Sequence, residues 1–270
     1  MRIKNKLATR LAIKDGRVKL GALDMTKRIA LVTGGMGGIG QAICENLADH
    51  EFKVIAAYNR SDDSAKEWLD NEKKSGYQFD IIHVDVTNMT SCEAMINKIE
   101  KEIGPIDVLV NNAGITRDKS ICNMNKEDWD IIINTDLSSV FYVTRSIIAH
   151  MKARRFGRII NISSINGQKG QYGQVNYAAA KAGMHGFTKA LALEVAKHGI
   201  TVNTVSPGYV ATDMVMSMPE KIRDKIINEI PMGRLAEPIE VARVVTFLAD
   251  DKNSYITGAN FAINGGQYLL

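Results

Sequence analysis

Three side chains that can take part in proton transfer lie close together in the sequence. Tyr177 follows Ser164 by thirteen positions, and Lys181 follows Tyr177 by four. A free phenol titrates near ~10 and a neighbouring ammonium favours its charged form, so such a pair suits proton exchange near neutral pH. A serine hydroxyl can donate a second hydrogen bond to the reacting oxygen. The spacing predicts proton transfer to or from a carbonyl or carbinol oxygen, although a helical tyrosine followed by a lysine is also common in plain packing.

The segments around these residues indicate how they are positioned. The run YAAAKAGMHGFTKALALEVA is rich in helix formers and lacks proline, so Tyr177 and Lys181 share one helix face. Ser164 comes directly after the apolar run RIINIS, which predicts a strand. Such strands alternate with helical segments along the chain, and 270 residues suffice for one core. The pattern predicts an α/β fold, a Rossmann-like doubly wound parallel sheet in a single domain.

A glycine-rich segment near the start of this domain predicts a nucleotide site. The apolar run RIALV leads into TGGMGGIG and then into a helical pattern. Glycines permit positive φ and let the backbone approach a pyrophosphate at a helix N-terminus. A glycine cluster alone is weak, but the order strand, turn and helix favours a dinucleotide. The residues expected at this site are Gly34, Met36, Gly37, Gly38, Ile39 and Gly40.

The next strand bears on the choice of cofactor. It ends at Tyr58 and is followed by Asn59 and Arg60, where an NAD site usually has an acid for the ribose 2′-hydroxyl. An arginine suits a 2′-phosphate, so we expect NADP (NADPH) bound by Asn59 and Arg60. Asp62 and Asp63 lie close behind, so NAD remains an alternative cofactor. The alternative for Arg60 is a solvated residue at a strand end with no ligand.

The ends of later strands complete the expected crevice, because ligands bind at the carboxyl ends of parallel strands. Asp85 and Val86 are expected at the adenine. Asn112, Ala113 and Gly114 are expected at the ribose and nicotinamide, or form a plain turn. The rigid turn after the sixth strand is expected to bind the carboxamide through Pro207, Gly208, Val210 and Thr212. The segment 211–231, rich in methionine and charge, predicts a substrate lid or a plain pair of surface helices.

Composition excludes several classes of protein. A net charge of +4, with basic and acidic residues interspersed, argues against nucleic-acid binding. No apolar run is long enough to span a bilayer. The three cysteines and five histidines show no ligand spacing, so no metal site is expected. The cysteines are expected to be reduced packing residues of a protein in the cytoplasm. Residues 1–24 are basic and lack a secretory h-region; we expect a poorly ordered extension ahead of a domain at 25–270, rather than a transit peptide.

The chain from about Met25 resembles the short-chain dehydrogenase/reductase family. The shared motifs are TGGMGGIG, NNAG at 111–114, Ser164, the YAAAK pair and the PG at 207–208. The resemblance implies a Rossmann fold, usually a homotetramer, and hydride transfer between a nicotinamide and a carbonyl or alcohol carbon. It makes Tyr177 the proton donor, lets Ser164 orient the carbonyl oxygen, and has Lys181 bind the nicotinamide ribose and promote ionisation of the tyrosine.

Two branches of that family compete, and a third reading stays open. The stretches NNAGITRD and GQKGQYGQVNYAAAKAG are most similar to those of reductases of acetoacetyl-CoA, which supply polyhydroxyalkanoate synthesis. This branch implies an acyl-CoA thioester as the substrate. Reductases of acyl-carrier-protein thioesters share ITRD and YAAAKAG. A non-catalytic cofactor-binding scaffold is the third. Arg154, Arg155 and Lys197 are candidates to meet an acidic carrier protein, CoA phosphates or only water. The resemblance places near the acyl thioester Asp118, Gln171, Tyr172, Gly173, Gln174 and Tyr209.

One position departs from the family pattern. The family has a fourth catalytic residue, an asparagine, and the matching residue in INTDLSSVF is Asp136. In the family the backbone carbonyl of this residue holds a water that links the lysine to solvent, which aspartate can also do. The carboxylate adds a negative charge that opposes Lys181. We expect that Asp136 keeps the relay and that the enzyme is active.

Overall fold

The computed structural model describes residues 12–14, 17–19 and 27–269. Within the expected extension 1–24 it describes two short strands, β1 (Ala12–Lys14) and β2 (Arg17–Lys19), which pair antiparallel. The rest of that segment lies outside the described residues. The boundary between an extension and a domain at residue 25 therefore stays a prediction.

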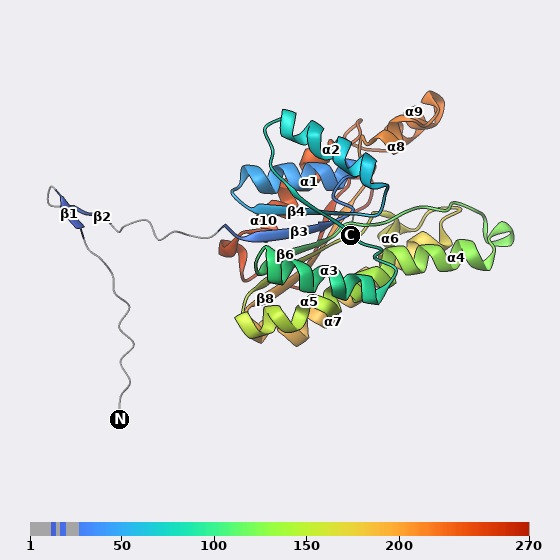
Figure 1. Cartoon of the computed structure of the whole chain (residues 1–270). Helices are drawn as coiled ribbons and strands as arrows, with labels where there is room; N and C mark the ends of the chain where they lie inside the picture. Colours follow the sequence, from blue (N-terminus) through green and yellow to red (C-terminus); the bar gives the residue numbers. More distant parts are fainter. Residues whose placement is uncertain (1–11, 15–16, 20–26, 270) are drawn as a thin grey trace.

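The centre of the fold is a parallel sheet of seven strands in the order β5-β4-β3-β6-β7-β8-β9 (Figure 1). The order runs outward in both directions from the β3–β6 pair, which is the switch point where such sheets bind ligands. This confirms the expected Rossmann-like fold. The strands are β3 (Ile29–Thr33), β4 (Lys53–Tyr58), β5 (Asp80–His83), β6 (Ile106–Asn111), β7 (Gly157–Ile162), β8 (Ile200–Pro207) and β9 (Asn260–Ile263).

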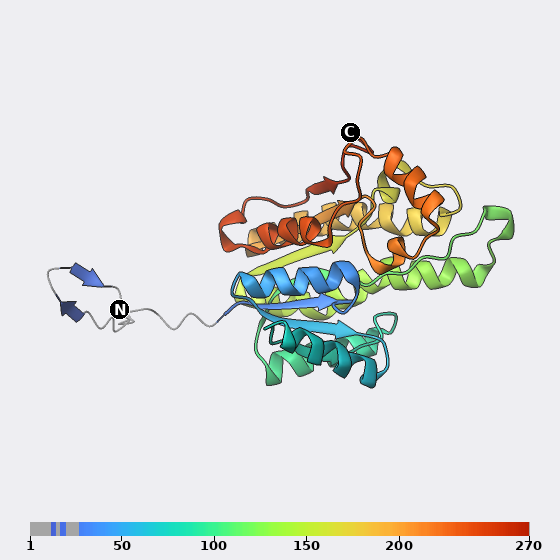
Figure 2. The same cartoon turned by 90° about the horizontal axis from the view of Figure 1, so that it is seen from above.

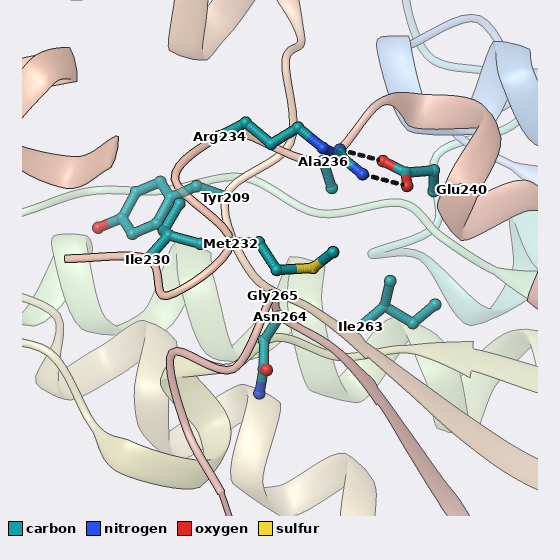
Figure 3. Close-up of a pocket in the computed structure, with 9 residues that line it drawn as sticks. All are labelled: Tyr209, Ile230, Met232, Arg234, Ala236, Glu240, Ile263, Asn264 and Gly265. Carbon is teal, nitrogen blue, oxygen red and sulfur yellow. Dashed lines mark hydrogen bonds and ion pairs between the residues drawn. The ribbon is translucent and has the colours of Figure 1, made fainter. Parts of the chain in front are cut away.

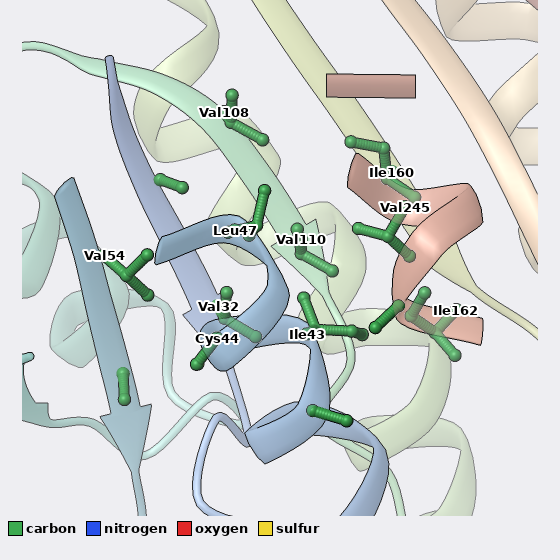
Figure 4. Close-up of a cluster of buried hydrophobic side chains, with 14 of the residues drawn as sticks. Val32, Ile43, Cys44, Leu47, Val54, Val108, Val110, Ile160, Ile162 and Val245 are labelled. Atoms are coloured by element: carbon green, nitrogen blue, oxygen red, sulfur yellow. The ribbon is translucent and has the colours of Figure 1, made fainter. Parts of the chain in front are cut away.

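Helices cover both faces of the sheet, which explains why its central strands are largely apolar. In β3, Ala30 and Val32 pack with the helices of one face, and Ile29 and Leu31 pack with those of the other. The first face carries α1 (Gly38–Asp49), α2 (Asp62–Lys74) and α10 (Pro238–Ala249). Figure 4 shows side chains of α1 and α10 packed with those of β3, β4, β6 and β7. The second carries α3 (Met89–Glu102), α5 (Ser139–Arg154) and α7 (Val175–Val195).

Several further elements lie at the carboxyl ends of the strands (Figure 2). The helix α4 (Lys126–Ile133) continues through a π-helical turn, Asn134–Ser138, into α5. The segment expected to be a lid or surface helices contains two helices, α8 (Asp213–Met216) and α9 (Glu220–Asn228), and α6 (Asn166–Lys169) lies just before α7. Short 3-10 turns span Ile121–Asn123, Ala196–His198 and Asp251–Asn253.

Three local expectations need correction. The third strand ends at His83, so Asp85 and Val86 lie beyond it rather than at its end. In the helical region 126–151 the apolar spacing predicts a core stripe of Trp129, Ile132, Ile133, Leu137, Val140 and Phe141. Ile132 and Val140 are buried, whereas Trp129 is 38% and Phe141 46% exposed. Cys122 is exposed, whereas packing was expected of every cysteine. In the described part of the chain, no helix is both long and apolar enough to span a bilayer.

Candidate active site

The tyrosine and the lysine lie together at the first turns of α7. Lys181 is 3% exposed, and its Nζ lies 5.5 Å from the centroid of the Tyr177 ring. The ammonium donates to the carbonyl oxygen of Ile162 at 3.1 Å, which ties α7 to the end of β7. The half-buried Tyr177 is thereby held beside a fixed cation, as the i and i+4 spacing predicted.

Ser164 follows β7 directly and packs against the same helix. Its side chain is 8% exposed, and its Oγ accepts a hydrogen bond from the N–H of Asn166 at 3.1 Å, which leaves the hydroxyl hydrogen free to donate. The preceding Ser163 donates to the carbonyl oxygen of Lys181 at 2.8 Å. A side chain at Gly167 would come within 2.8 Å of the Lys181 carbonyl carbon, so this close contact requires glycine. The serine loop and the Tyr177 helix are therefore joined tightly.

Asp136 lies in the π-helical turn and reaches the lysine with its side chain. Asp136 is 0% exposed. Its Oδ1 accepts a hydrogen bond from the N–H of Ile115 at 2.9 Å, and its Oδ2 lies 3.3 Å from Lys181 Nζ. Burial raises the pKa of the Asp136 carboxyl, and the Lys181 ammonium and the Ile115 N–H partly oppose this rise. The structure thus brings all four predicted catalytic residues to one place.

The glycine-rich loop between β3 and α1 has the shape that a pyrophosphate needs. Gly34 adopts a positive φ of 61°, and a Cβ at Gly40 would lie only 2.1 Å from the Gly34 carbonyl oxygen. No side chain caps the N-terminus of α1 at Gly37, so its first N–H groups are open to an anion. A Cβ at Gly38 would lie 2.8 Å from Thr212 Cγ2, which places the turn after β8 across the loop, as expected. A dinucleotide fits this cradle.

The asparagine motif after β6 is fixed to the same loop. Asn112 Nδ2 donates to the carbonyl oxygens of Thr33 at 3.0 Å and Gly34 at 3.1 Å. The Thr33 hydroxyl accepts the N–H groups of Asn112 and Ala113 at 3.0 and 3.1 Å. Thr33 was missing from the expected site, although its place just before the glycines was a usable signal. Gly114 closes against the ion pair, since a Cβ there would lie 2.8 Å from Asp136 Oδ2.

The residues after β4 and β5 were expected at the adenosine end of the cofactor. Arg60 Nη2 donates to the carbonyl oxygen of Met36 at 3.1 Å, so the guanidinium lies over the glycine-rich loop. Asp62 instead accepts from the Tyr58 hydroxyl at 3.0 Å and belongs to the first turn of α2. Beyond β5, Asp85 Oδ1 accepts both the N–H and the hydroxyl of Thr87, at 2.9 and 2.7 Å. Its second carboxylate oxygen is left for a ligand.

The residues expected at the acyl thioester divide into two groups. Gln174 is 9% exposed, and its side-chain amide is hydrogen-bonded to two other side chains. It donates to Asp118 Oδ2 at 2.8 Å and accepts from Asn166 Nδ2 at 2.9 Å. It therefore connects the serine loop to the loop after β6. By contrast, Gln171 is exposed, and the Tyr172 side chain, 88% exposed, projects into solvent. The carbonyl oxygen of Gly173 accepts the N–H of Lys119 at 2.8 Å, which holds this turn in place.

Tyr209 lies on the other side of the crevice, after β8. Burial raises the pKa of its phenol, with smaller contributions from Glu229 and Asp118. The pocket beside it is small, about 50 Å³, and the Arg234–Glu240 ion pair at 2.7 Å closes one wall (Figure 3). Sites for larger ligands hold several hundred Å³, so this pocket alone does not hold a thioester. Its lining residues are Tyr209, Ile230, Met232, Arg234, Ala236, Glu240, Ile263, Asn264 and Gly265.

Asn176 was not singled out from the sequence, yet it orients the start of α7. Its Nδ2 donates to the carbonyl oxygens of Arg117 at 3.2 Å and Asp128 at 2.9 Å, and its Oδ1 accepts the N–H of Tyr177 at 2.8 Å. A fully buried asparagine directly before the tyrosine is thus part of the support of the site. Its polar side chain in a helix's first turn was the only available signal.

Comparison with known proteins agrees with this geometry. The family model described as short chain dehydrogenase matches residues 28–223. The chain belongs to the short-chain dehydrogenase family. It is 49% identical to the acetoacetyl-CoA reductase of Cupriavidus necator over 91% of this chain and 100% of that protein. The corresponding enzyme of Allochromatium vinosum is 51% identical over 90% and 99%. The 3-oxoacyl-acyl-carrier-protein reductase of Escherichia coli is 46% identical over 90% and 98%.

Membership of the short-chain dehydrogenase family makes the chain an oxidoreductase that uses a nicotinamide cofactor. The family resemblance drawn from the motifs is therefore confirmed.

Proposed function

We propose that this chain reduces acetoacetyl-CoA to (R)-3-hydroxybutyryl-CoA with NADPH, and so supplies polyhydroxyalkanoate synthesis. The observation that carries the proposal is the meeting of Ser164, Tyr177 and Lys181 beside the glycine-rich cradle, in a chain 49% and 51% identical to two acetoacetyl-CoA reductases. A cytoplasmic homotetramer without a metal is part of the same proposal.

The side chains divide the reaction between them. When bound, a reduced nicotinamide supplies a hydride to the 3-keto carbon. Ser164 donates its free hydroxyl hydrogen to the keto oxygen and holds it in line. Tyr177 gives its phenolic proton to that oxygen as negative charge develops there. Lys181, held by Ile162 and Asp136, orients the ribose and stabilises the phenolate that remains.

The preference for NADPH rests on the arrangement after β4. The Arg60 guanidinium reaches over the glycine-rich loop toward the place of the adenosine ribose. Its competitor Asp62 accepts from the Tyr58 hydroxyl and lies in the first turn of α2, and the other acid, Asp63, lies 3.9 Å from the ammonium of Lys66. An arginine beside the glycine-rich loop, with both acids engaged by other side chains, suits a 2′-phosphate.

The second candidate function is reduction of acyl-carrier-protein thioesters, which the 46% identity to the Escherichia coli enzyme favours. The basic residues considered for carrier docking argue against it. Arg154 pairs with Glu100 at 2.6 Å, and Arg155 donates to the Lys197 carbonyl at 3.0 Å. All three basic residues precede β7 or β8, so they lie at the amino ends of the strands, opposite Ser164. A carrier protein seated there does not face the site.

Initial rates with NADPH test the proposal, using acetoacetyl-CoA and acetoacetyl-acyl-carrier protein in one assay. A clear preference for the CoA ester is expected. Preference for the carrier-protein ester would instead support the second function. Turnover of neither ester by protein that binds NADPH would contradict both and favour another carbonyl substrate or a non-catalytic role.

A further inference from the structure

The carboxylate that replaces the family asparagine makes contacts that a backbone relay does not need. Asp136 Oδ2 lies 3.3 Å from Lys181 Nζ, and no described group gives this oxygen a hydrogen bond. Oδ1 is fixed by the N–H of Ile115 at 2.9 Å. The side chain is thus aimed at the lysine and clamped in that orientation by the loop after β6.

Solvent has little access to this ion pair. The side-chain exposures are 4% for Lys181 and 0% for Asp136. The backbone of Gly114 closes the remaining side, because a Cβ there would lie 2.8 Å from Asp136 Oδ2 and 3.2 Å from Lys181 Nζ. Opposite charges interact strongly in such a poorly hydrated setting, so the carboxylate offsets much of the field of the ammonium.

Other charged groups around the pair are already engaged or distant along their elements. On α7, the His185 ring contacts Ser163 Oγ at 2.9 Å, and Lys189 is exposed two turns beyond Lys181. From the loop after β6, Asp118 accepts from Gln174. From α4, Asp128 pairs with Lys119 at 2.6 Å. Among the described residues, Asp136 is the one carboxylate paired with the lysine.

We propose that Asp136 is a positioning residue that neutralises Lys181, so that Tyr177 keeps its proton to higher pH and the site favours carbonyl reduction over alcohol oxidation. The proposal rests on the proposed function, since it takes Tyr177 as the proton donor. Reduction needs the phenol to start protonated, with the proton passing to the carbonyl oxygen. A lone ammonium promotes loss of the Tyr177 proton, whereas an ion pair of no net charge promotes this loss less. An asparagine at this position leaves the ammonium unopposed.

The test is Asp136→Asn, followed by two readouts. The first is ultraviolet absorbance of tyrosinate against pH, with Tyr177→Phe in each background to isolate the signal of Tyr177. We expect Tyr177 to ionise at lower pH in Asp136→Asn than in wild type, because the ammonium beside it is then unopposed. The second is kcat for reduction with saturating NADPH, whose alkaline limb should move to lower pH by the same amount. Unchanged midpoints in both would show a merely structural ion pair and overturn the proposal.

Two further variants keep the result interpretable. Asp130→Asn makes the same substitution in the exposed Lys126–Asp130 ion pair of α4, and it should leave both readouts at their wild-type values. Asp136→Ser lacks both carboxylate and amide, and it should shift both readouts in the same direction as Asp136→Asn. A shift with asparagine alone would assign the effect to its amide and contradict the charge argument.

The absorbance titration needs no thioester, so the two proposals fail separately. A shifted titration without turnover of either thioester would overturn the proposed substrate and leave the role of Asp136 standing. Turnover of acetoacetyl-CoA with identical titrations in wild type and Asp136→Asn would support the proposed substrate and overturn the role of Asp136.

Discussion

Replacing Gly40 by alanine tests whether the glycine-rich loop is shaped to hold a dinucleotide. The new Cβ would lie 2.1 Å from the Gly34 carbonyl oxygen and 2.8 Å from Asn112 Nδ2. Atoms in ordinary contact stand ~3.5 Å apart, so the loop has to retreat by roughly 1 Å or more. Overpacking of this kind costs about 1–3 kcal/mol, and the better helix propensity of alanine in α1 returns about 1 kcal/mol.

The expected result separates stability from binding. A net cost of about 1 kcal/mol lowers Tm by roughly 2–4 °C in a chain of this size. Displacing a group that positions a ligand by about 1 Å can weaken the interaction on the order of 10²-fold, so we expect the Kd for NADPH to rise by about that factor. Fluorescence titration with NADPH measures Kd, and calorimetry measures Tm.

A matched control is Gly186→Ala, also a helical glycine, whose Cβ would meet no atom within 4 Å. It should raise Tm slightly and leave NADPH affinity unchanged. If Gly40→Ala binds NADPH as tightly as wild type, the loop is not the pyrophosphate site and the reasoning is wrong.

Three further substitutions have expected outcomes. Ser164→Ala should lower kcat by about 10²–10³-fold with little change in NADPH affinity, because one donor to the keto oxygen is lost. Steady-state rates and fluorescence titration measure the two quantities, and an unchanged kcat would remove Ser164 from the mechanism. Arg60→Gln should raise the KM for NADPH by roughly tenfold and leave that for NADH unaltered, since a charge-assisted contact is worth about 1.5–3 kcal/mol; equal effects on both cofactors would contradict a 2′-phosphate contact. Burial raises the pKa of Glu72 to about 7, so the native state binds more protons there than the unfolded chain and loses stability as pH rises from about 4.5 to about 7. Glu72→Gln should therefore increase the free energy of unfolding by about 1–2 kcal/mol at pH 8 and not at pH 4, in urea titrations; an equal effect at both pH values would argue against a buried, protonating carboxyl.

The parts of the fold that the sequence predicted have strong local signals. The central strands β3, β4, β6 and β7 are largely apolar because both faces of the sheet are covered, and the glycines after β3 are required by backbone contacts within the loop itself. Tyr177 and Lys181 share a helix face for the same local reason. The helix α2 escaped notice because its sequence, DDSAKEWLDNEKK, is charged and buries only Ala65, Trp68 and Glu72.

The parts that could not be predicted depend on contacts between distant segments. The family resemblance places Gln174 near the acyl thioester, which stays a prediction. That its amide also joins Asn166 to Asp118 could not be predicted, because three loops have to meet. Arg154 was a plausible docking cation until the fold placed Glu100 beside it. The sequence showed that Asp136 replaces an asparagine, whereas its approach to Lys181 depends on the π-helical turn.

The measurement that tests the central claim most directly is a pair of assays on Tyr177→Phe: NADPH binding by fluorescence titration, and initial rates of acetoacetyl-CoA reduction. Because the substitution removes only the phenolic oxygen, the proton-donor role predicts wild-type binding of NADPH and loss of turnover. Lost NADPH binding would mean that Tyr177 holds the cofactor, and turnover at the wild-type rate would mean that another group supplies the proton.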